Sequence, residues 1–301
     1  MPGQRADTSP PLIALFCELG HLKRITSAER EGSIATRLFL RAWGALVAGD
    51  DPSAVMRWTV GAAVAAARLG DLDLAKLREL GLSEVEASTV LRAGFEAVGE
   101  TIDERLAGEL KEALLDDVFA GPPPAFAILL AGQPRAGVTC PGKPRLMLEP
   151  AENHVEHSLA VAVFGVLLAA EYRSDLTMVF LAGLGHHLHN AAMPDSGFTG
   201  EVLLGDLLDG VISCSRERAY AELSEPLQSR MREALVPIVD DLSPEGRAFH
   251  AADVIDRVLE IEQHLAAART TMDMVLHDYE LVHAGPVKAF HDATLREVGL
   301  L

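Results

Sequence analysis

The chain has 301 residues, of which 49% are hydrophobic, and a formal net charge of −18 at pH 7. A chain of this length accommodates about two domains and can bury a sizeable core. Nucleic-acid binding draws most of its affinity from clustered Lys and Arg, so the acidic balance argues against a nucleic-acid partner. We expect a small substrate or a protein partner instead, including a second copy of the chain in a homo-oligomer.

The apolar runs of the sequence are shorter than the roughly 18 to 20 residues that a membrane span requires. The N-terminal segment MPGQRADTSPP lacks the layout of a signal peptide. Cys17, Cys140 and Cys214 are odd in number and have no paired spacing, which predicts buried thiols rather than disulfides or a thiolate metal site. These features predict a soluble cytoplasmic protein with no membrane partner.

Amphipathic helices are predicted along most of the chain, with almost no strand signal, so the expected fold class is all-α. The helical period and its capping residues predict helices over 11–20, 34–48, 53–70, 83–98, 101–118, 124–131, 154–171, 176–191, 199–213, 225–239, 244–270 and 273–296. The run Gly121-Pro122-Pro123-Pro124 interrupts the pattern. We therefore expect a helical domain over 1–120, a connecting segment over 121–150 and a second helical domain over 151–301.

Three imidazoles and an amide follow one another closely in the segment His186-His187-Leu188-His189-Asn190. On a continuous helix His186 shares a face with His189 and Asn190, whereas His187 is rotated by about 100°. A single histidine on an apolar face is more often a satisfied core residue than a ligand. Neutral imidazole is the commonest protein ligand of transition metals, and three together favour a metal site.

Three segments of the second half resemble the His…His-Asp…Asp signature of the HD superfamily of metal-dependent phosphohydrolases. They are ENHVEHSL (152–159), GHHLHNAAMPDSG (185–197) and FHAADVID (249–256). The similarity covers about residues 140–270 and implies an all-helical HD core, with 5′-deoxynucleotidases among the relatives. It implies that His157, His186 and Asp253 are metal ligands, and that His187 stands where the family has an aspartate.

This departure changes the expected metal. Imidazole ligates one metal through one nitrogen and cannot bridge two as a carboxylate can. It also brings no negative charge, so we expect one divalent transition-metal ion (Zn, Fe, Co, Ni or Mn) rather than Mg²⁺. Asn190 stands where relatives carry a lysine or a catalytic acid. An amide orients a phosphate or a water but transfers no proton at neutral pH.

Proton transfer must then come from another side chain. His189 is the first candidate and Asp195 the second, with Glu156 and His250 as further candidates. Further along the Asp253 helix, structural ion pairs are expected of Asp256, Arg257 and Glu260. Three cations of the connecting segment, Arg135, Lys143 and Arg145, could hold an anionic substrate in this acidic chain; the alternative is that they are solvated loop charges. Asn190 is a further candidate for binding the substrate.

The first half resembles the second at a constant offset of 121 residues. SIATRLFLRAWGALVA (33–48) aligns with HVEHSLAVAVFGVLLA (154–169). The same offset places Thr36 at the position of His157, and Ala65 and Ala66 at those of His186 and His187. The first half is therefore either a degenerate HD-like repeat or an unrelated set of apolar helices, and in both cases it lacks the metal ligands.

Three functions remain open. The first is a metal-dependent phosphohydrolase acting on a small phosphorylated substrate such as a nucleotide. The second is a non-catalytic regulatory or scaffold protein that retains the fold, which the residues His187 and Asn190 favour. The third is an HD-type iron oxygenase with a two-iron site. That branch needs two further histidines between the second and last motif elements, where only His189 and His250 are available, and it needs the bridging aspartate that His187 replaces.

Overall fold

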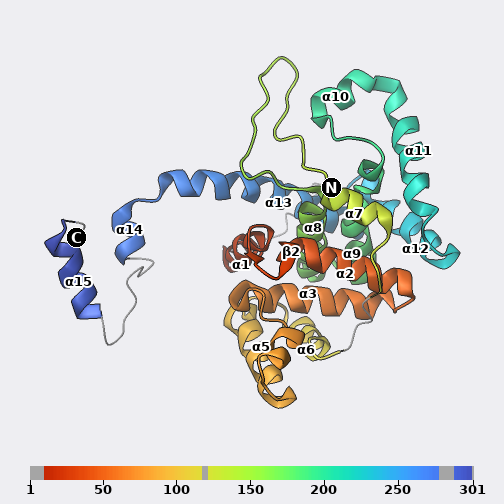
Figure 1. Ribbon diagram of the computed structural model, residues 1–301. Coiled ribbons are helices and arrows are strands. Elements are labelled where there is room, and N and C mark those ends of the chain that lie inside the picture. The colour runs from red at the N-terminus through yellow and green to blue at the C-terminus, as the bar shows by residue number, and fades with distance from the viewer. Residues whose placement is uncertain (1–9, 117–120, 278–287, 300–301) are drawn as a thin grey trace. The chain divides into compact units, whose positions relative to one another are not determined.

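The computed structural model describes residues 10–116, 121–277 and 288–299 (Figure 1). These residues are mostly helical, and the sheet found among them is a two-stranded antiparallel hairpin of β1 (Thr26–Ser27) and β2 (Arg30–Ser33). The all-α class is confirmed. The chain divides into two compact units, Met1–Glu260 and Ile261–Leu301.

Helices of the first unit follow in close succession along the chain. The first half contributes α1 (Pro10–Gly20), the 3₁₀ helix η1 (His21–Lys23), α2 (Ile34–Ala48), α3 (Pro52–Leu69), α4 (Leu74–Glu79), α5 (Glu84–Gly99) and α6 (Glu104–Ala113). The second half contributes α7 (Ala125–Ala131), α8 (His154–Tyr172), α9 (Leu176–Gly185), η2 (Leu188–Ala191), α10 (Gly197–Leu204), η3 (Gly205–Leu207), α11 (Leu208–Tyr220), α12 (Glu225–Leu235), η4 (Pro237–Val239) and most of α13 (Pro244–Arg269). The second unit holds the end of α13, α14 (Met272–His277) and α15 (Lys288–Glu297).

Helix starts follow local capping chemistry. Asp51 accepts a hydrogen bond from the Ala54 amide ahead of α3, and Ser83 forms a capping box with Glu86 at the start of α5. Each such cap satisfies amides that the first helical turn leaves without a partner. The predicted capping box at Ser83 is thereby confirmed.

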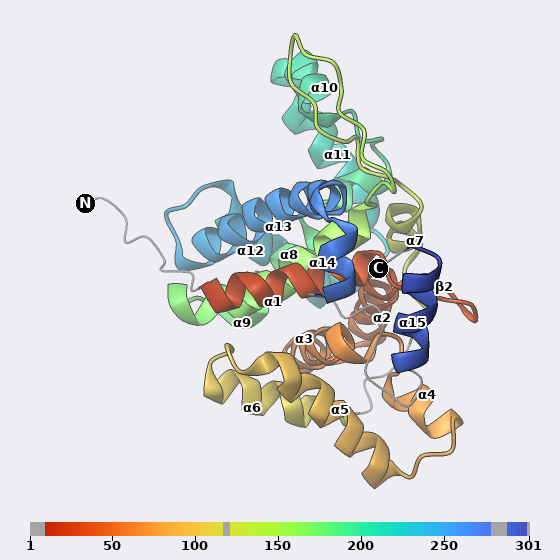
Figure 2. The same ribbon diagram turned by 90° about the vertical axis from the view of Figure 1, so that its left-hand side faces the viewer.

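One hydrophobic core joins the two halves of the first unit. Phe16 of α1 stacks on Phe164 of α8 with ring centroids 4.2 Å apart, and Trp43 of α2 meets Phe126 of α7 edge-on at 4.9 Å. All four rings are at most 1% exposed and belong to a single cluster of buried side chains. Both views place α2, α3, α8 and α9 at the centre of this unit (Figures 1 and 2). Apolar faces of α1, α2 and α3 are therefore covered in part by the second half.

α8 is the central helix of this core. Its length and composition would suffice to cross a membrane, but 83% of its most apolar window is buried inside the protein. A helix that is apolar all round in this way fits the core of a helical protein. α9 crosses it closely at Gly183, where a Cβ atom would lie 2.4 Å from Cα of Ala162. A side chain at Gly183 would force these helices apart.

Several predicted helices end differently from expectation. The expected helix over 176–191 breaks after Gly185, and that over 199–213 is replaced by α10, η3 and α11. α4 and the β1–β2 hairpin were not predicted. Parts of the helices expected over 101–118 and 273–296 fall on residues 117–120 and 278–287, outside the described residues.

The three cysteines are exposed, not buried as predicted. None of them forms a disulfide. Cys17 lies on the outer face of α1, opposite the buried Phe16, because neighbouring positions of a helix point in different directions.

Helices recur in the two halves at the offset of 121 residues. Adding 121 to the residue numbers of α2 gives 155–169, which lies within α8. The same shift of α5 gives 205–220, the residues of η3 and α11, and the shift of α6 gives 225–234, which lies within α12. Contacts recur as well, since α3 packs against α6 as α9 packs against α12. The predicted boundaries at 120 and 150 both fall inside the first compact unit.

Candidate metal centre

Three segments bring the histidines together. Asn153 caps α8 by accepting hydrogen bonds from the amides of Val155 and Glu156, and His154 and His157 lie in the first turn. α9 ends at Gly185, directly before His186 and His187. His187 has φ −100° and ψ 14°, outside the helical values, and η2 begins after it. The expectation of one continuous helix with His187 rotated away is therefore wrong, because the chain turns between the two halves of this segment.

As a result, the rings of His186 and His187 both face His157. The ring centroids of His186 and His187 lie 4.1 Å apart, and they lie 5.2 and 5.3 Å from that of His157. One ligand atom from each of the three residues can be chosen so that all lie within 4.8 Å of one another. His157 is completely buried, and the other two are largely enclosed. Such a set can hold a metal ion.

The Nδ1 atom of each ring has an oxygen partner. Nδ1 of His157 lies 2.7 Å from Oδ2 of Asp256, Nδ1 of His186 lies 2.8 Å from the carbonyl oxygen of Gly183, and Nδ1 of His187 lies 2.8 Å from Oδ1 of Asn190. Because these oxygens accept hydrogen bonds, each Nδ1 carries the proton and Nε2 keeps its lone pair. Nε2 of His157 and of His186 are buried without a hydrogen-bond partner. Metal-ligating histidines show this arrangement.

Asp253 of α13 supplies a carboxylate at the same place. Its Oδ1 lies 3.2 Å from Nε2 of His157, and its Oδ2 lies 3.3 Å from Nη1 of Arg257. Burial alone would raise the pKa of Asp253, but the surrounding charges, that of Arg257 among them, hold it below its usual range. A fourth ligand with negative charge is thus available next to the three imidazoles.

Burial lowers the pKa values of His186 and His187 well below their usual value, and the neighbouring imidazoles lower them further. Both rings are therefore neutral at physiological pH. A neutral ring is the form that binds a metal without first releasing a proton.

A buried ion-pair network lies behind His157. The ammonium group of Lys23, from η1, donates to Glu152, to Oδ1 of Asp256 at 2.7 Å and to Oε2 of Glu260 at 3.5 Å. Lys23 is 4% exposed. Burial would lower its pKa, but the three carboxylates raise it above the usual range, so Lys23 is charged. Asp256 and Glu260 form the ion pairs expected of them, and Asp256 also orients His157.

Glu152, His157 and Asp256 form a second group whose ligand atoms lie within 4.8 Å of one another. The Lys23 ammonium already contacts both carboxylates of this group. A bound cation would face this ammonium at close range, and like charges in a buried site repel strongly. We therefore consider only the first group as a candidate metal site.

Proton-transfer candidates from the sequence lie beside the three imidazoles. The His189 ring centroid is 5.8 Å from that of His187, and burial lowers the pKa of His189 to about 4. Asp195 accepts hydrogen bonds from the amides of Ala136 and Gly197, both at 2.8 Å, and its Oδ2 lies 3.5 Å from Nε2 of His154. Both candidates are thus brought close to the site.

The basic residues of the connecting segment differ in their contacts. Arg145 donates to the carbonyl oxygens of Ala136 and Ser196, so it holds the loop that carries Asp195. Lys143 is exposed and has no side-chain bond among those of the described residues. Arg135 is the cation that reaches the site: it lies 3.2 Å from Glu152, and its charge lowers the pKa values of His154, His186 and His187.

Other sequence candidates have structural partners. Oδ1 of Asn190 accepts a hydrogen bond from His187, and its Nδ2 donates one to the carbonyl oxygen of Met193 at 3.3 Å. Both polar atoms of this amide are therefore hydrogen-bonded within the protein. Glu156 caps α8 and accepts a hydrogen bond from Ser33 at 2.6 Å. The ring of His250 lies 5.2 Å from Phe249.

His154 was not among the predicted site residues. It is 1% exposed, its ring lies 4.8 Å from that of His187, and neither ring nitrogen has a hydrogen-bond partner. Its burial lowers its pKa to about 3. The spacing of His154 and His157, one helical turn apart, is the sequence signal that could have found it.

Comparisons with protein-family models, with curated proteins and with solved structures found no match for this chain.

Proposed function

We propose that this protein is an HD-type metalloprotein that holds one divalent transition-metal ion and hydrolyses a small phosphate ester, such as a nucleotide. His157, His186, His187 and Asp253 would be the ligands. The observation that carries the proposal is that the three Nδ1 atoms are tied to oxygen acceptors, which leaves Nε2 of each ring available beside a carboxylate. Three imidazoles and one carboxylate suit zinc, iron, cobalt, nickel or manganese.

A divalent ion in this place supplies a Lewis acid, which offsets phosphoryl charge and makes water nucleophilic near neutral pH. The chain's own groups would do the rest. Asp195 is fixed by two backbone amides and accepts a proton, and Arg135 adds positive charge beside the imidazoles. His189 is the second candidate for proton transfer, because its low pKa keeps it neutral at pH 7.

A non-catalytic metal-binding scaffold is the second candidate. The observation that favours it is the use of both polar atoms of Asn190 inside the protein, since the residue at this position then neither binds substrate nor transfers a proton. A fold can persist after its activity is lost, because function resides in the site and not in the fold.

We further propose that the first half is a degenerate copy of the second. The recurrence of helices and helix contacts at one offset supports it. Ala65 and Ala66 stand where the second half has His186 and His187, so the copy has no metal site. The exposed thiols and the absence of disulfides fit a reducing compartment, and we propose the cytoplasm.

Elemental analysis of the purified protein, combined with a phosphate-release screen over nucleotides, tests these proposals. We expect one transition-metal ion per chain, and its loss in His186→Ala and in Asp253→Ala. His291→Ala, which removes an exposed imidazole of α15, is the matched control and should keep the metal. Metal content unchanged in both ligand variants would contradict the site. One metal per chain without phosphate release from any nucleotide would favour the scaffold.

His187→Asp separates the two candidates further. An aspartate restores a negative charge among the ligands, so metal preference should move towards Mn²⁺ and Mg²⁺. A hydrolase should then keep or gain phosphate release, whereas a scaffold stays at background. If activity is present in the native chain and disappears in His187→Asp, the imidazole has a catalytic role beyond ligation.

A further inference from the structure

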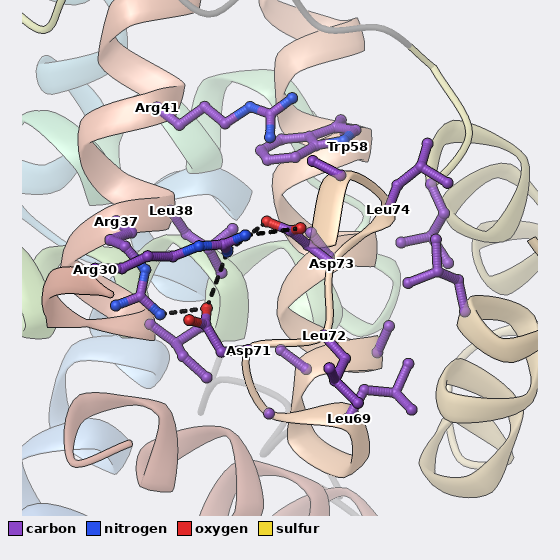
Figure 3. Close-up of a pocket in the computed structure, with 18 of the residues that line it drawn as sticks. Arg30, Arg37, Leu38, Arg41, Trp58, Leu69, Asp71, Leu72, Asp73 and Leu74 are labelled. Carbon is purple, nitrogen blue, oxygen red and sulfur yellow. Dashed lines mark hydrogen bonds and ion pairs between the residues drawn. The ribbon is translucent and has the colours of Figure 1, made fainter. Parts of the chain in front are cut away.

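A cavity of about 270 Å³ lies in the first half, between α2, α3, α4 and α5 (Figure 3). Its wall is mostly apolar, with Leu38 of α2, Leu69 of α3, Leu74 of α4 and Leu91 of α5. None of the candidate metal ligands borders it. Its volume is slightly below the range of roughly 300 to 1,000 Å³ that is usual for small-molecule sites. The space suits a compact ligand.

Small side chains on α3 make this space. Ala62, Ala65 and Ala66 line it, and α5 packs across the same face of α3. At the offset of 121 residues, Ala65 and Ala66 correspond to His186 and His187. Imidazole rings fill that position in the second half, whereas methyl groups leave it open in the first. The lining of the cavity thus includes the counterparts of two of the candidate metal ligands, while Thr36, the counterpart of His157, does not border it.

Charged side chains gather on one side of the cavity. Arg30 reaches between two aspartates, with its Nη1 3.2 Å from Asp71 and 2.7 Å from Asp73, and Arg37 also bonds Asp71 (Figure 3). Arg30 and Arg37 are held in place by these pairs, and each guanidinium has five N–H donors. The lining includes four arginines against three aspartates, in a chain whose net charge is −18. Arg78 also pairs with Glu84, so the formal charges around the cavity balance, and what the arginines offer a ligand is N–H donors held in place.

A flat aromatic surface completes the lining. The Arg41 guanidinium lies over the Trp58 ring, 4.1 Å from its centroid (Figure 3). Trp58 is 7% exposed and borders the cavity together with the alanines of α3. An aromatic ring with a guanidinium on its face is a rigid platform that offers both apolar contact and positive charge.

We propose that this cavity binds a small aromatic anion. Its ring packs against Trp58 and the alanines of α3, and its carboxylate or phosphoryl group accepts hydrogen bonds from the arginines. The planar fork of a guanidinium matches either oxyanion. This site is separate from the metal centre and does not depend on the function proposed for it.

The experiment uses tryptophan fluorescence of the full chain, which has two tryptophans. Trp43 is completely buried, and Trp43→Phe leaves Trp58 as the reporter. We expect a saturable change in Trp58 fluorescence on titration with phenylphosphonate or benzoate. Whichever of the two binds more tightly shows whether the site prefers a phosphoryl group or a carboxylate. Methylphosphonate, without a ring, and benzyl alcohol, without a charge, should bind at least about tenfold more weakly. No saturable change with either aromatic anion up to millimolar concentration would overturn the proposal.

Two variants locate the probe. Ala66→Leu fills the cavity and should weaken binding at least about tenfold, whereas Ala97→Leu, at an exposed position of α5, should not. Arg41→Met keeps an apolar side chain over Trp58. It should weaken the binding of phenylphosphonate and benzoate but leave that of uncharged benzyl alcohol unchanged. Circular dichroism verifies that each variant is folded. Binding that survives both Ala66→Leu and Arg41→Met, or that disappears in His186→Ala at the metal centre, would refute this site.

Discussion

Replacing Lys23 with methionine tests how the first half supports the metal centre. Methionine keeps an unbranched stem of similar length but removes the ammonium group from a position that is 4% exposed. Glu152, Asp256 and Glu260 then lose the cation that they share. Breaking a buried ion pair by removing one partner costs about 3–5 kcal/mol, because the remaining charge stays desolvated. We expect the free energy of unfolding to fall by this amount.

Urea unfolding of the metal-free chain, followed by circular dichroism, measures the change. Lys111→Met is the control, since Lys111 and Glu96 form an exposed pair at 3.3 Å. Exposed pairs contribute about 0–1 kcal/mol. If Lys23→Met and Lys111→Met lower the free energy of unfolding equally, the buried network stabilises the protein no more than an exposed ion pair does.

Lys23→Met should also weaken metal binding. Asp256 orients the ring of His157, and Lys23 holds Asp256. Loss of such an outer partner typically costs about 10–100-fold in metal affinity. Competition with a chelator measures this, and the double variant Lys23→Met with Glu260→Gln should recover part of the stability, because one fewer charge is left buried.

Three further predictions concern the core, the amide and the pH dependence. Phe164→Ala should lower the free energy of unfolding by about 3–5 kcal/mol, because the ring is completely buried and stacked on Phe16; a loss below about 1 kcal/mol in urea titrations would contradict a shared core. Asn190→Ala should weaken metal binding about 10–100-fold, because the His187 ring loses its acceptor; unchanged competition with a chelator would show that Asn190 does not orient it. Burial lowers the pKa of His154 from 6.5 to about 3, so the unfolded chain binds a proton that the folded chain does not. The stability that His154 contributes in the metal-free chain is complete above pH 6.5 and is lost as the pH falls towards 3, and His154→Gln should flatten this part of the urea-midpoint profile.

Much of the fold was predictable because local chemistry decides where helices begin. The predicted bounds of α2 were confirmed at both ends, since Ser33 caps its start and Gly49, with φ 98°, ends it in a conformation that favours glycine. Less was predictable where tertiary contacts decide. The break after Gly185 has no proline or charged stop signal, and it allows two consecutive histidines to face the same neighbour.

Pairs distant in sequence were the least predictable part of the candidate site. Residue types identified the three imidazoles and Asp253, but no local pattern indicates that Lys23 reaches Asp256, 233 residues later. The roles of Asp256 and Asn190 towards the imidazole Nδ1 atoms depend on the ring orientations, which packing fixes. Three loop cations were expected from the sequence, but which of them reaches the site depends on tertiary contacts. Arg135 does so by pairing with Glu152, whereas Lys143 stays exposed.

The Lys23 network also constrains the order in which the chain can fold during synthesis. Lys23 is made early, but its partners Glu152, Asp256 and Glu260 follow 129, 233 and 237 residues later. On the ribosome only Glu152 is available to pair with this ammonium group until α13 has emerged, and burying it with an incomplete set of partners is costly. The first half therefore reaches its final packing only when almost the whole compact unit has been translated. Contacts of such high sequence separation also slow folding, because long loops must close before the contacts form.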